Sequence, residues 1–201
     1  MLRMRRARRA SVRRRNGWRR VGDGFLAVAL LALLVLLAAR LDLAGMRTLE
    51  GSAVVNDGDT ITLGAERIRL RGIDAPEYDQ ICMRDGADYP CGRMARQALV
   101  ALVGKGAVAC KGSERDKYDR LLATCSVGGV DLNRSQVAAG WAVSYGDYRA
   151  EEDAARAKGA GLWAGSFDRP RDWRQAHGGM VEIEHAASGL LGWLKRLFRF
   201  S

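Results

Sequence analysis

Three short stretches of this sequence carry residue types suited to phosphoryl-transfer chemistry. They are residues 57–60 (DGDT), 69–77 (RLRGIDAPE) and 116–120 (DKYDR). Carboxylates bind hard cations, and the planar fork of an arginine can bind two phosphate oxygens at once. All three stretches fall within about a third of the chain. Together they predict one site assembled from separate segments.

Each stretch is ambiguous by itself. Asp57 and Asp59 are two residues apart, so in a strand both side chains face the same way, yet an isolated D-G-D is more often a turn than a metal site. Asp74 ends a predicted strand that leads into a turn at Pro76, and residues 116–120 alone indicate an exposed hairpin loop. The indication of a site therefore comes from the combination.

The elements that must position these residues are mostly short strands. Strands are predicted at residues 54–55, 60–63, 67–73, 108–110 and 121–127, and in the third of them Ile68 and Leu70 alternate with arginines. Helices are predicted at 93–103, at 132–139 with Asp131 as the cap, and at 150–158. Five strands with inserted helices predict an α+β domain, mainly β, built on a small closed barrel.

The net charge of +10 belongs to one end of the chain. Residues 1–22 contain ten arginines and no acidic residue, which leaves 23 basic and 23 acidic residues in the remainder. The basic pI therefore gives no evidence of a basic, nucleic-acid-binding face on the folded domain. A claim of nucleic-acid chemistry depends on the site residues alone.

An apolar run follows the basic segment. Residues 24–39 lack charge and Arg40 closes them, which predicts a membrane anchor over residues 24–44, or a cleaved export signal. A buried soluble helix and a twin-arginine signal are the alternatives. The arginines should remain cytoplasmic, so we expect the rest of the chain on the periplasmic or extracellular side of the cell membrane, or secreted after cleavage. The expected organisation is a basic disordered arm (1–23), the membrane segment (24–44), a folded domain (46–177) and a linker with an amphipathic tail (178–201).

Four cysteines lie on the side expected to be exported. An even count in an oxidising compartment predicts two disulfides, with three possible connectivities. We favour Cys82–Cys91, which closes a local loop, and Cys110–Cys125, which joins two strands of a hairpin. Zinc is the alternative, but the sequence has no C-x-x-C pair and His177 and His185 are far downstream.

Taken together, these motifs resemble the staphylococcal nuclease (thermonuclease) family. The resemblance covers roughly residues 54–163 and includes the later G-W-A with its tyrosines (140–148) and the closing G-L-W (161–163). It implies a five-stranded OB-fold barrel with about three packed helices. It also implies hydrolysis of phosphodiester bonds in DNA and RNA with calcium as the cofactor.

The resemblance also assigns roles to individual residues. Asp59 and Asp74 match the calcium carboxylates, with the main-chain carbonyl of Ala75 as a third ligand. Arg69 and Arg120 match the phosphate-binding arginines, and Glu77 matches the glutamate that positions or deprotonates the attacking water. The remaining matches are substrate contacts by Lys117, Tyr118, and Tyr145 or Tyr148.

Two departures from the family pattern bear on this site. Ala75 stands where threonine is common, but only its carbonyl is needed. Asp119 stands where glycine is usual, so its carboxylate could pair with Arg120, although neighbours in an extended segment point away from each other.

The leading hypothesis is a calcium-dependent endonuclease of low sequence specificity outside the cytoplasm. Its alternatives are a membrane-tethered OB-fold module that binds single-stranded nucleic acid without cutting it, and a membrane-associated structural protein. The presence of Arg69, Asp74, Glu77 and Arg120 together favours the enzyme. No obligate protein partner is evident from the sequence.

Overall fold

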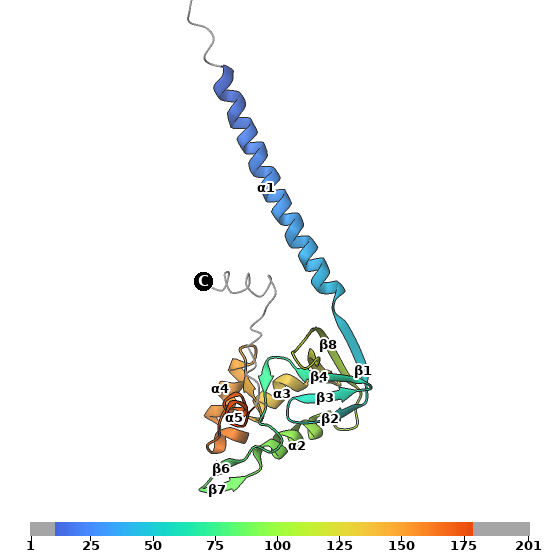
Figure 1. The fold of residues 1–201 in the computed structure, drawn as a ribbon, viewed down its shortest axis with the longest axis vertical. Coiled ribbons are helices and arrows are strands. Elements are labelled where there is room, and N and C mark those ends of the chain that lie inside the picture. Colours follow the sequence, from blue (N-terminus) through green and yellow to red (C-terminus); the bar gives the residue numbers. More distant parts are fainter. Residues whose placement is uncertain (1–10, 179–201) are drawn as a thin grey trace, which may run out of the picture. The chain divides into compact units, whose positions relative to one another are not determined.

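The computed structural model describes residues 11–178, which form two units that separate after Gly45 (Figure 1). The first unit contains one helix, α1 (Ser11–Ala44). This helix starts inside the arginine-rich segment, so residues 11–23 are helical where the sequence predicted a disordered arm. The predicted C-terminal amphipathic tail falls almost entirely outside the described residues.

The membrane segment predicted over residues 24–44 is not supported. Among residues 11–178, no helix has the length and apolar character needed to cross a bilayer.

The second unit is an α+β domain built on one curled sheet. Its strands lie in the order β1-β8-β9-β4-β3-β2, and β10 pairs with β9. The bounds are β1 (Arg47–Gly51), β2 (Ala53–Val55), β3 (Thr60–Leu63), β4 (Glu66–Leu70), β8 (Val108–Arg115), β9 (Leu121–Val127) and β10 (Val130–Asp131). The outermost strands β1 and β2 are separated in the chain only by Ser52. A sheet whose two ends belong to one continuous stretch of chain must curl, which gives the half-barrel shape.

The sequence prediction of a five-stranded barrel is therefore correct in class but not in detail. The sheet has seven strands, because β1 and the two-residue β10 join it. Two small sheets accompany it: β5 (Ile73–Asp74) pairs with β11 (Val143–Ser144), and β6 (Cys82–Arg84) pairs with β7 (Ala87–Tyr89). The β4–β9 pair is parallel, whereas the other pairs are antiparallel.

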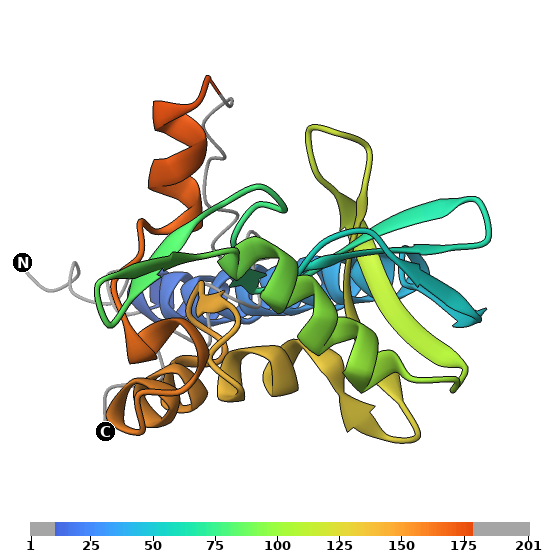
Figure 2. The ribbon, with the colours of Figure 1, turned by 90° about the horizontal axis from the view of Figure 1, so that it is seen from below.

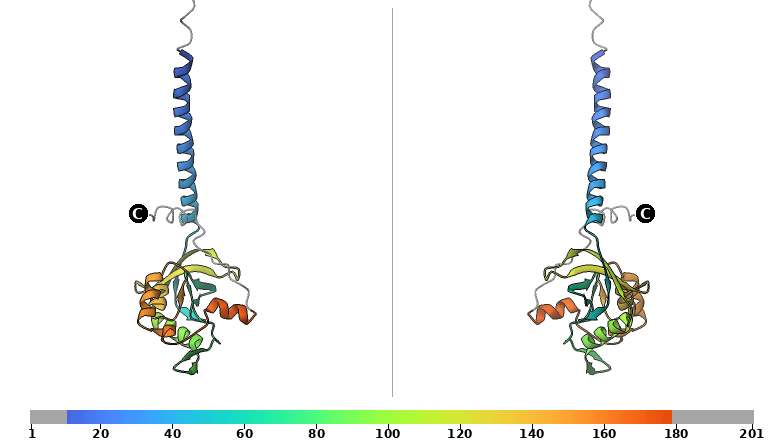
Figure 3. Two further views of the ribbon diagram at one scale, coloured as in Figure 1. Left: turned by 90° about the vertical axis from the view of Figure 1, so that its left-hand side faces the viewer. Right: turned by 90° about the vertical axis from the view of Figure 1, so that its right-hand side faces the viewer.

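Helices pack against the sheet, and several of them lie beside it on one side of the domain (Figure 2). They are α2 (Cys91–Val103), α3 (Leu132–Ala138), α4 (Arg149–Ala157), the short 3₁₀ helix η1 (Gly161–Ala164) and α5 (Pro170–Ala176). Helix α3 packs against α2, α4 and β9, and the Asp131 carboxylate accepts a hydrogen bond of 2.9 Å from the Arg134 amide as its cap. The sequence predicted α2, α3 and α4 but missed α5, which lies apart from α4 (Figure 3).

The core fills the inside of the curled sheet and the base of α2 and α3. Its largest fully buried apolar side chains come from several elements and include Ile61, Ile68, Leu70, Ile73, Leu99, Leu121 and Leu132. Leu162 is buried in a second, smaller cluster with the cysteines Cys82 and Cys91. One arginine of β4 departs from the predicted alternation, because Arg69 is only 7% exposed. Both faces of β4 are therefore covered near its end, and the second face is covered by polar groups.

Both disulfides have the predicted connectivity. Cys82–Cys91 ties β6 to the start of α2, and Cys110–Cys125 joins residues directly opposite each other on β8 and β9. The described residues contain no free cysteine. Stable disulfides are typical of proteins outside the reducing cytoplasm, which agrees with an extracytoplasmic location.

The turn between β8 and β9 carries the third motif of the sequence. Asp119 adopts a left-handed backbone conformation (φ 61°), and its side chain is 87% exposed. Its carboxylate lies 3.5 Å from Arg115 Nη1, whereas Arg120 pairs with Asp116 at 2.6 Å. The Asp119 carboxylate therefore contacts Arg115, but the reason is a left-handed turn and not the extended segment that the sequence argument assumed.

The disulfides give a first testable prediction. Replacing Cys110 and Cys125 together by alanine should lower the free energy of unfolding by about 3 kcal/mol, because a loop of this length is no longer closed in the unfolded chain. Urea denaturation measures the change, and the Cys82→Ala, Cys91→Ala pair, which closes a shorter loop, serves for comparison. Four titratable thiols in denatured, unreduced protein would contradict the pairing.

The left-handed turn gives a second prediction. Asp119→Gly should raise the free energy of unfolding by up to about 1 kcal/mol, because glycine adopts positive φ without the penalty of a Cβ atom. Asp119→Ala is the control, since it removes the same carboxylate but keeps the Cβ. Equal stability of the two variants in chemical denaturation would show that the backbone conformation is not the cause.

Candidate active site

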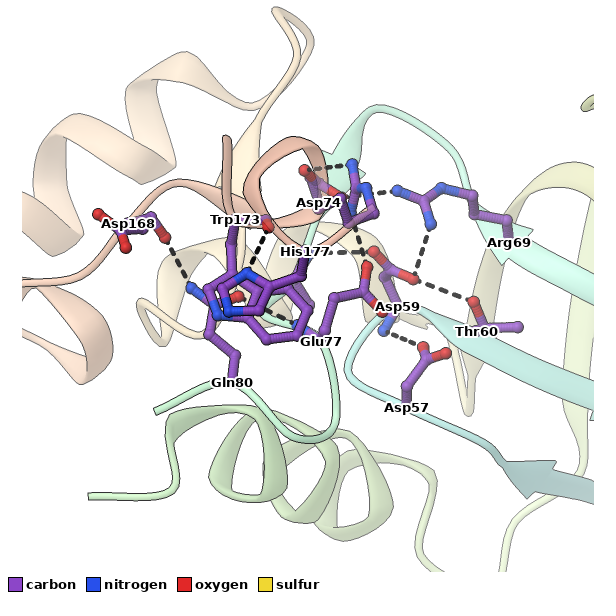
Figure 4. A network of polar contacts seen from close by, with 12 residues as sticks. Asp57, Asp59, Thr60, Arg69, Asp74, Glu77, Gln80, Asp168, Trp173 and His177 are labelled. Atoms are coloured by element: carbon purple, nitrogen blue, oxygen red, sulfur yellow. Dashed lines mark hydrogen bonds and ion pairs between the residues drawn. The ribbon is translucent and has the colours of Figure 1, made fainter. Parts of the chain in front are cut away.

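The site forms where the ends of β3, β4 and β5 come together. Asp59 immediately precedes β3, Arg69 belongs to β4, and Asp74 ends β5. The backbone holds these ends in register, because the Leu70 amide donates to the Asp59 carbonyl at 2.8 Å. Figure 4 shows the Asp59, Arg69 and Asp74 side chains gathered at this point.

A glycine allows the D-G-D segment to lie this close to Asp74. A Cβ atom on Gly58 would lie 2.6 Å from the Cβ of Ala75 and 2.9 Å from that of Ala95. The Gly58 carbonyl also accepts a 3.0 Å hydrogen bond from the buried Gln136 side chain. The glycine between the two aspartates thus serves close packing, and places Asp59 against Ala75.

A buried arginine joins the two predicted metal carboxylates. Arg69 donates to Asp59 Oδ1 at 3.3 Å and to Asp74 Oδ1 at 2.7 Å. Asp59 is 3% exposed and Asp74 is fully buried. Charged groups at such depth require partners, and this guanidinium supplies one positive charge to both.

Several hydrogen-bond donors hold the Asp59 carboxylate. Besides Arg69, it accepts from the Thr60 hydroxyl at 3.0 Å and from the Ala75 amide at 2.9 Å. Burial acts to raise the pKa of Asp59, but the Arg69 charge and the Ala75 amide outweigh it and place the pKa below its ordinary value. Asp59 is thus ionised at neutral pH.

Asp57 differs from its neighbour although only Gly58 separates them. Burial and the nearby Asp59 carboxylate raise the pKa of Asp57 to about 7. Its Oδ1 accepts from the Asp59 amide at 3.1 Å, so it stabilises the turn before β3. The sequence pattern suggests two equivalent aspartates, but the structure gives them different roles.

The Arg120 guanidinium is oriented by Asp116. It donates through Nε at 2.7 Å to Asp116 Oδ2, and Nη2 is 2.6 Å from the same oxygen. Its Nη1 donates to Thr60 Oγ1 at 3.3 Å, and that hydroxyl contacts Asp59. Thr60 therefore connects the arginine of the β8–β9 turn to the carboxylates. The Tyr118 ring lies beside the Arg120 guanidinium. The centroid of the ring is 5.2 Å from Arg120 Cζ and 5.0 Å from Lys117 Nζ.

The two candidate tyrosines lie in different places. The Tyr145 hydroxyl donates to Asp74 Oδ2 at 3.0 Å, and burial together with the Asp74 charge raises the pKa of Tyr145, so it remains a donor. Tyr148 is 7% exposed and belongs to the hydrophobic core. The structure thus brings Tyr145 to the site and leaves Tyr148 away from it.

Glu77 lies on the loop after Asp74, and Gln80 shapes that loop. The buried Gln80 side chain accepts from the Glu77 amide at 3.2 Å and donates to the Asp168 carbonyl at 2.7 Å (Figure 4). Burial raises the pKa of Glu77, although a hydrogen bond from Arg174 opposes the shift. A carboxylate with a raised pKa is suited to proton transfer near neutral pH.

Sequence reasoning missed one residue of this site. Arg174 of α5 donates to Asp74 at 2.9 and 3.1 Å and to Glu77 Oε1 at 2.8 Å. It follows Asp74 by 100 residues, in a helix that the periodicity did not reveal. In the sequence, Arg174 is one arginine in a segment with no assigned motif, and such a residue gives no usable indication of a site.

The donor chemistry of the site fits a hard cation. Asp59 and Asp74 offer buried carboxylate oxygens from two segments, and calcium accepts main-chain carbonyls and water as further ligands. Within the described part of the chain, no cluster of three or more His, Cys, Asp or Glu side chains has the arrangement to hold a metal ion by itself. A cation at this site therefore needs ligands beyond acidic side chains.

Comparison with known proteins agrees with this chemistry. The family described as "Staphylococcal nuclease homologue" matches residues 67–165, a range that includes Arg69, Asp74, Glu77 and Arg120 and begins after Asp59. The succinoglycan biosynthesis protein ExoI of Rhizobium meliloti (strain 1021) is 36% identical over 140 residues, which cover 66% of this chain and 73% of that protein.

Two further relatives carry nuclease names. An uncharacterized endonuclease of Haemophilus influenzae (strain ATCC 51907 / DSM 11121 / KW20 / Rd) is 31% identical over 134 residues, or 60% of this chain and 70% of that protein. The probable staphylococcal-like nuclease CAN3 of Oryza sativa subsp. japonica is 32% identical over 146 residues, which cover 69% of this chain but only 35% of the rice protein. This chain belongs to the staphylococcal nuclease family of phosphodiester-hydrolysing enzymes.

Proposed function

We propose that this protein is a calcium-dependent endonuclease that cuts DNA and RNA with low sequence specificity outside the cytoplasm. The observation that carries the proposal is the cluster in which Arg69 joins Asp59 to Asp74. Glu77 lies at the edge of that cluster, because one nitrogen of Arg174 contacts both Asp74 and Glu77. The two disulfides support the extracytoplasmic location.

The cation would be held by Asp59 and Asp74, with the carbonyl of Ala75 as the third protein ligand. When bound there, it would offset the negative charge of the phosphodiester and so favour attack by water. Hydrogen bonds from Thr60 and the Ala75 amide to Asp59, and from Arg69 to Asp74, hold the two carboxylates in place around this position.

The arginines bind the phosphate in this proposal. Arg120 is fixed by Asp116 and directs Nη1 toward Thr60, at the side of the site formed by Asp59. Arg69 donates to Asp59 Oδ1, the same oxygen that accepts from the Thr60 hydroxyl. Arginine pairs with the non-bridging oxygens of a phosphate, and the added negative charge of the transition state strengthens the interaction.

Glu77 acts on the attacking water. Its side chain is 36% exposed, unlike the buried aspartates, so solvent reaches it. Its raised pKa places the carboxylate closer to the pKa range of an effective general base. Water aligned by Glu77 attacks phosphorus, the bond to the leaving oxygen breaks, and the carboxylate takes the water proton.

Low sequence specificity follows from the residue types. The proposed contacts are made to phosphate oxygens, which are the same for every base. The non-catalytic binding module is disfavoured, because the arginines and the carboxylates needed for hydrolysis are all present and the family is one of enzymes.

The central test is an activity assay on the purified full-length chain with plasmid DNA and RNA. Cleavage should require added calcium and stop with a calcium chelator. Arg69→Ala should reduce kcat/KM by about 10²-fold or more, and Glu77→Gln by about 10²- to 10⁴-fold. Arg67→Ala is the matched control, since it removes the same charge from an exposed position of the same strand.

Circular dichroism must show that each variant remains folded. Glu77→Gln is the safer test, because Arg69→Ala leaves two buried carboxylates without their shared partner. Unchanged cleavage by folded Glu77→Gln, or cleavage that ignores the chelator, would refute the assignment.

Specificity is tested separately. Single-stranded DNA and RNA oligonucleotides of contrasting base composition should be cut at rates within about tenfold of one another, because phosphate contacts carry no base information. The measurement is the initial rate at equal concentration and fixed ionic strength. A preference of about 10³-fold for one base or one sugar would show that base or 2′-hydroxyl contacts decide the reaction.

A further inference from the structure

The carboxylate of Asp74 is fully occupied by hydrogen-bond donors. Its Oδ1 accepts from Arg69 Nη2 at 2.7 Å and from Arg174 Nη1 at 2.9 Å. Its Oδ2 accepts from the Tyr145 hydroxyl at 3.0 Å and from Arg174 Nη2 at 3.1 Å. An ionised carboxylate offers about four lone-pair directions, so these four donors use all of them.

A cation therefore cannot bind Asp74 in this arrangement. Calcium approaches its oxygen ligands to about 2.3–2.6 Å and needs a lone pair directed at it. At least one donor must leave before an ion can take its place. The identity of that donor decides how the site is controlled.

Two of the three donor residues are built into the folded core. Arg69 lies on β4, has a side chain 9% exposed, and also contacts Asp59. Tyr145 directly follows β11, and β11 pairs with the β5 strand that carries Asp74. Moving either residue would disturb the sheet that shapes the site.

Arg174 is the donor with the weakest attachment. Helix α5 has seven residues, and Pro170 is the one residue of α5 that is buried. The hydrogen bond from Gln80 to the Asp168 carbonyl fixes the segment before α5 and not the helix itself. Short elements with few buried contacts open at low free-energy cost, so α5 is the element able to move.

The charges also favour an exchange between Arg174 and a divalent cation. Asp59, Asp74 and Glu77 supply three negative charges when ionised, and Arg69 and Arg174 supply two positive ones, which leaves one net negative charge. A divalent cation in place of Arg174 makes this set neutral, whereas both together would leave it positive. Like charges held close in a buried site repel strongly.

We propose that Arg174 occupies the place of the calcium ion at Asp74 and is displaced when calcium binds. The inference rests on the proposed calcium-dependent function and adds its regulation. In the calcium-free protein, Arg174 bridges Asp74 and Glu77 and keeps both carboxylates satisfied. Calcium entry breaks these three hydrogen bonds and moves α5 away, which also releases Glu77 to act on water.

The exchange sets the calcium concentration at which the enzyme works. An internal competitor weakens binding, because the apparent Kd equals the intrinsic Kd divided by the fraction of molecules in which the site is open. A site weakened in this way would stay empty at the calcium concentration of the cytosol. It would fill at a concentration of about 1 mM, which matches the Kd range of extracellular calcium modules. The chain would then acquire activity only after export.

The test is calcium binding by the full-length chain, measured by equilibrium dialysis with radioactive calcium and without substrate. Arg174→Ala should bind calcium at least tenfold more tightly than the unmodified chain. Arg174→Lys keeps the charge but cannot bind both Asp74 oxygens in parallel, so its affinity should fall between the two. Gln175→Ala, at an exposed position of the same helix, is the matched control and should bind as the unmodified chain does.

A second measurement follows the helix itself. Hydrogen exchange of the peptide that contains residues 170–176 should become faster when saturating calcium is added to the unmodified chain, because α5 leaves the site. Unchanged or slower exchange would overturn the proposal, as would equal or weaker calcium binding by folded Arg174→Ala or, where that variant does not fold, by Arg174→Lys.

The outcomes separate this inference from the proposed function. Equal calcium binding by all variants, with calcium-dependent cleavage intact, would refute only the role of Arg174. Absence of calcium binding in every variant would refute both the role of Arg174 and calcium as the cofactor.

Discussion

The structure depends on a buried guanidinium shared by two carboxylates. Arg69 brings a positive charge to a place where Asp59 and Asp74 are almost wholly removed from water. Removal of one partner from such a group costs roughly 3–5 kcal/mol, because the remaining charge stays buried without compensation. The same arrangement places two anionic oxygen donors next to an arginine, which is the requirement for binding a cation and a phosphate together. Stability and chemistry therefore impose the same residues at this position.

Close backbone packing explains how such a group can form at the end of a curled sheet. Gly58 lets the D-G-D turn reach Ala75, and Gly92 lets the first turn of α2 reach the loop that carries Glu77, where a Cβ atom would lie 1.7 Å from the Glu77 carbonyl oxygen. The Cys82–Cys91 disulfide ties β6, farther along the same segment, to the start of α2. The segment between Asp74 and α2 is thus fixed by close backbone packing at Glu77 and by a covalent bond at Cys82.

The sequence predicted the parts of the site that are close together in the chain. Asp59, Arg69, Asp74 and Glu77 lie within 19 consecutive positions, on or next to strands that the sequence pattern predicts, and Arg120 lies in a motif of its own. Both disulfides followed from local loop and hairpin arguments. The D-G-D pattern by itself does not separate Asp57 from Asp59, and only the family resemblance pointed to Asp59. The structural difference depends on the Ala75 amide and on Arg69, which both contact Asp59. Arg174 could not be predicted either, because a seven-residue helix has too little periodicity to reveal which side chain faces the site.

The carboxylates that suit this site to binding a cation also destabilise the fold when no positive charge lies beside them. Without a cation, Asp74 and Glu77 would face each other across a partly buried space, and burial already raises the pKa of both. Under the proposed calcium dependence, a positive charge at this place compensates both carboxylates before the ion binds. Arginine suits that role, because its fork satisfies both Asp74 oxygens while one nitrogen also reaches Glu77. In the proposed exchange, α5 moves and takes this charge away, so the interaction that stabilises the calcium-free fold ends when the ion binds.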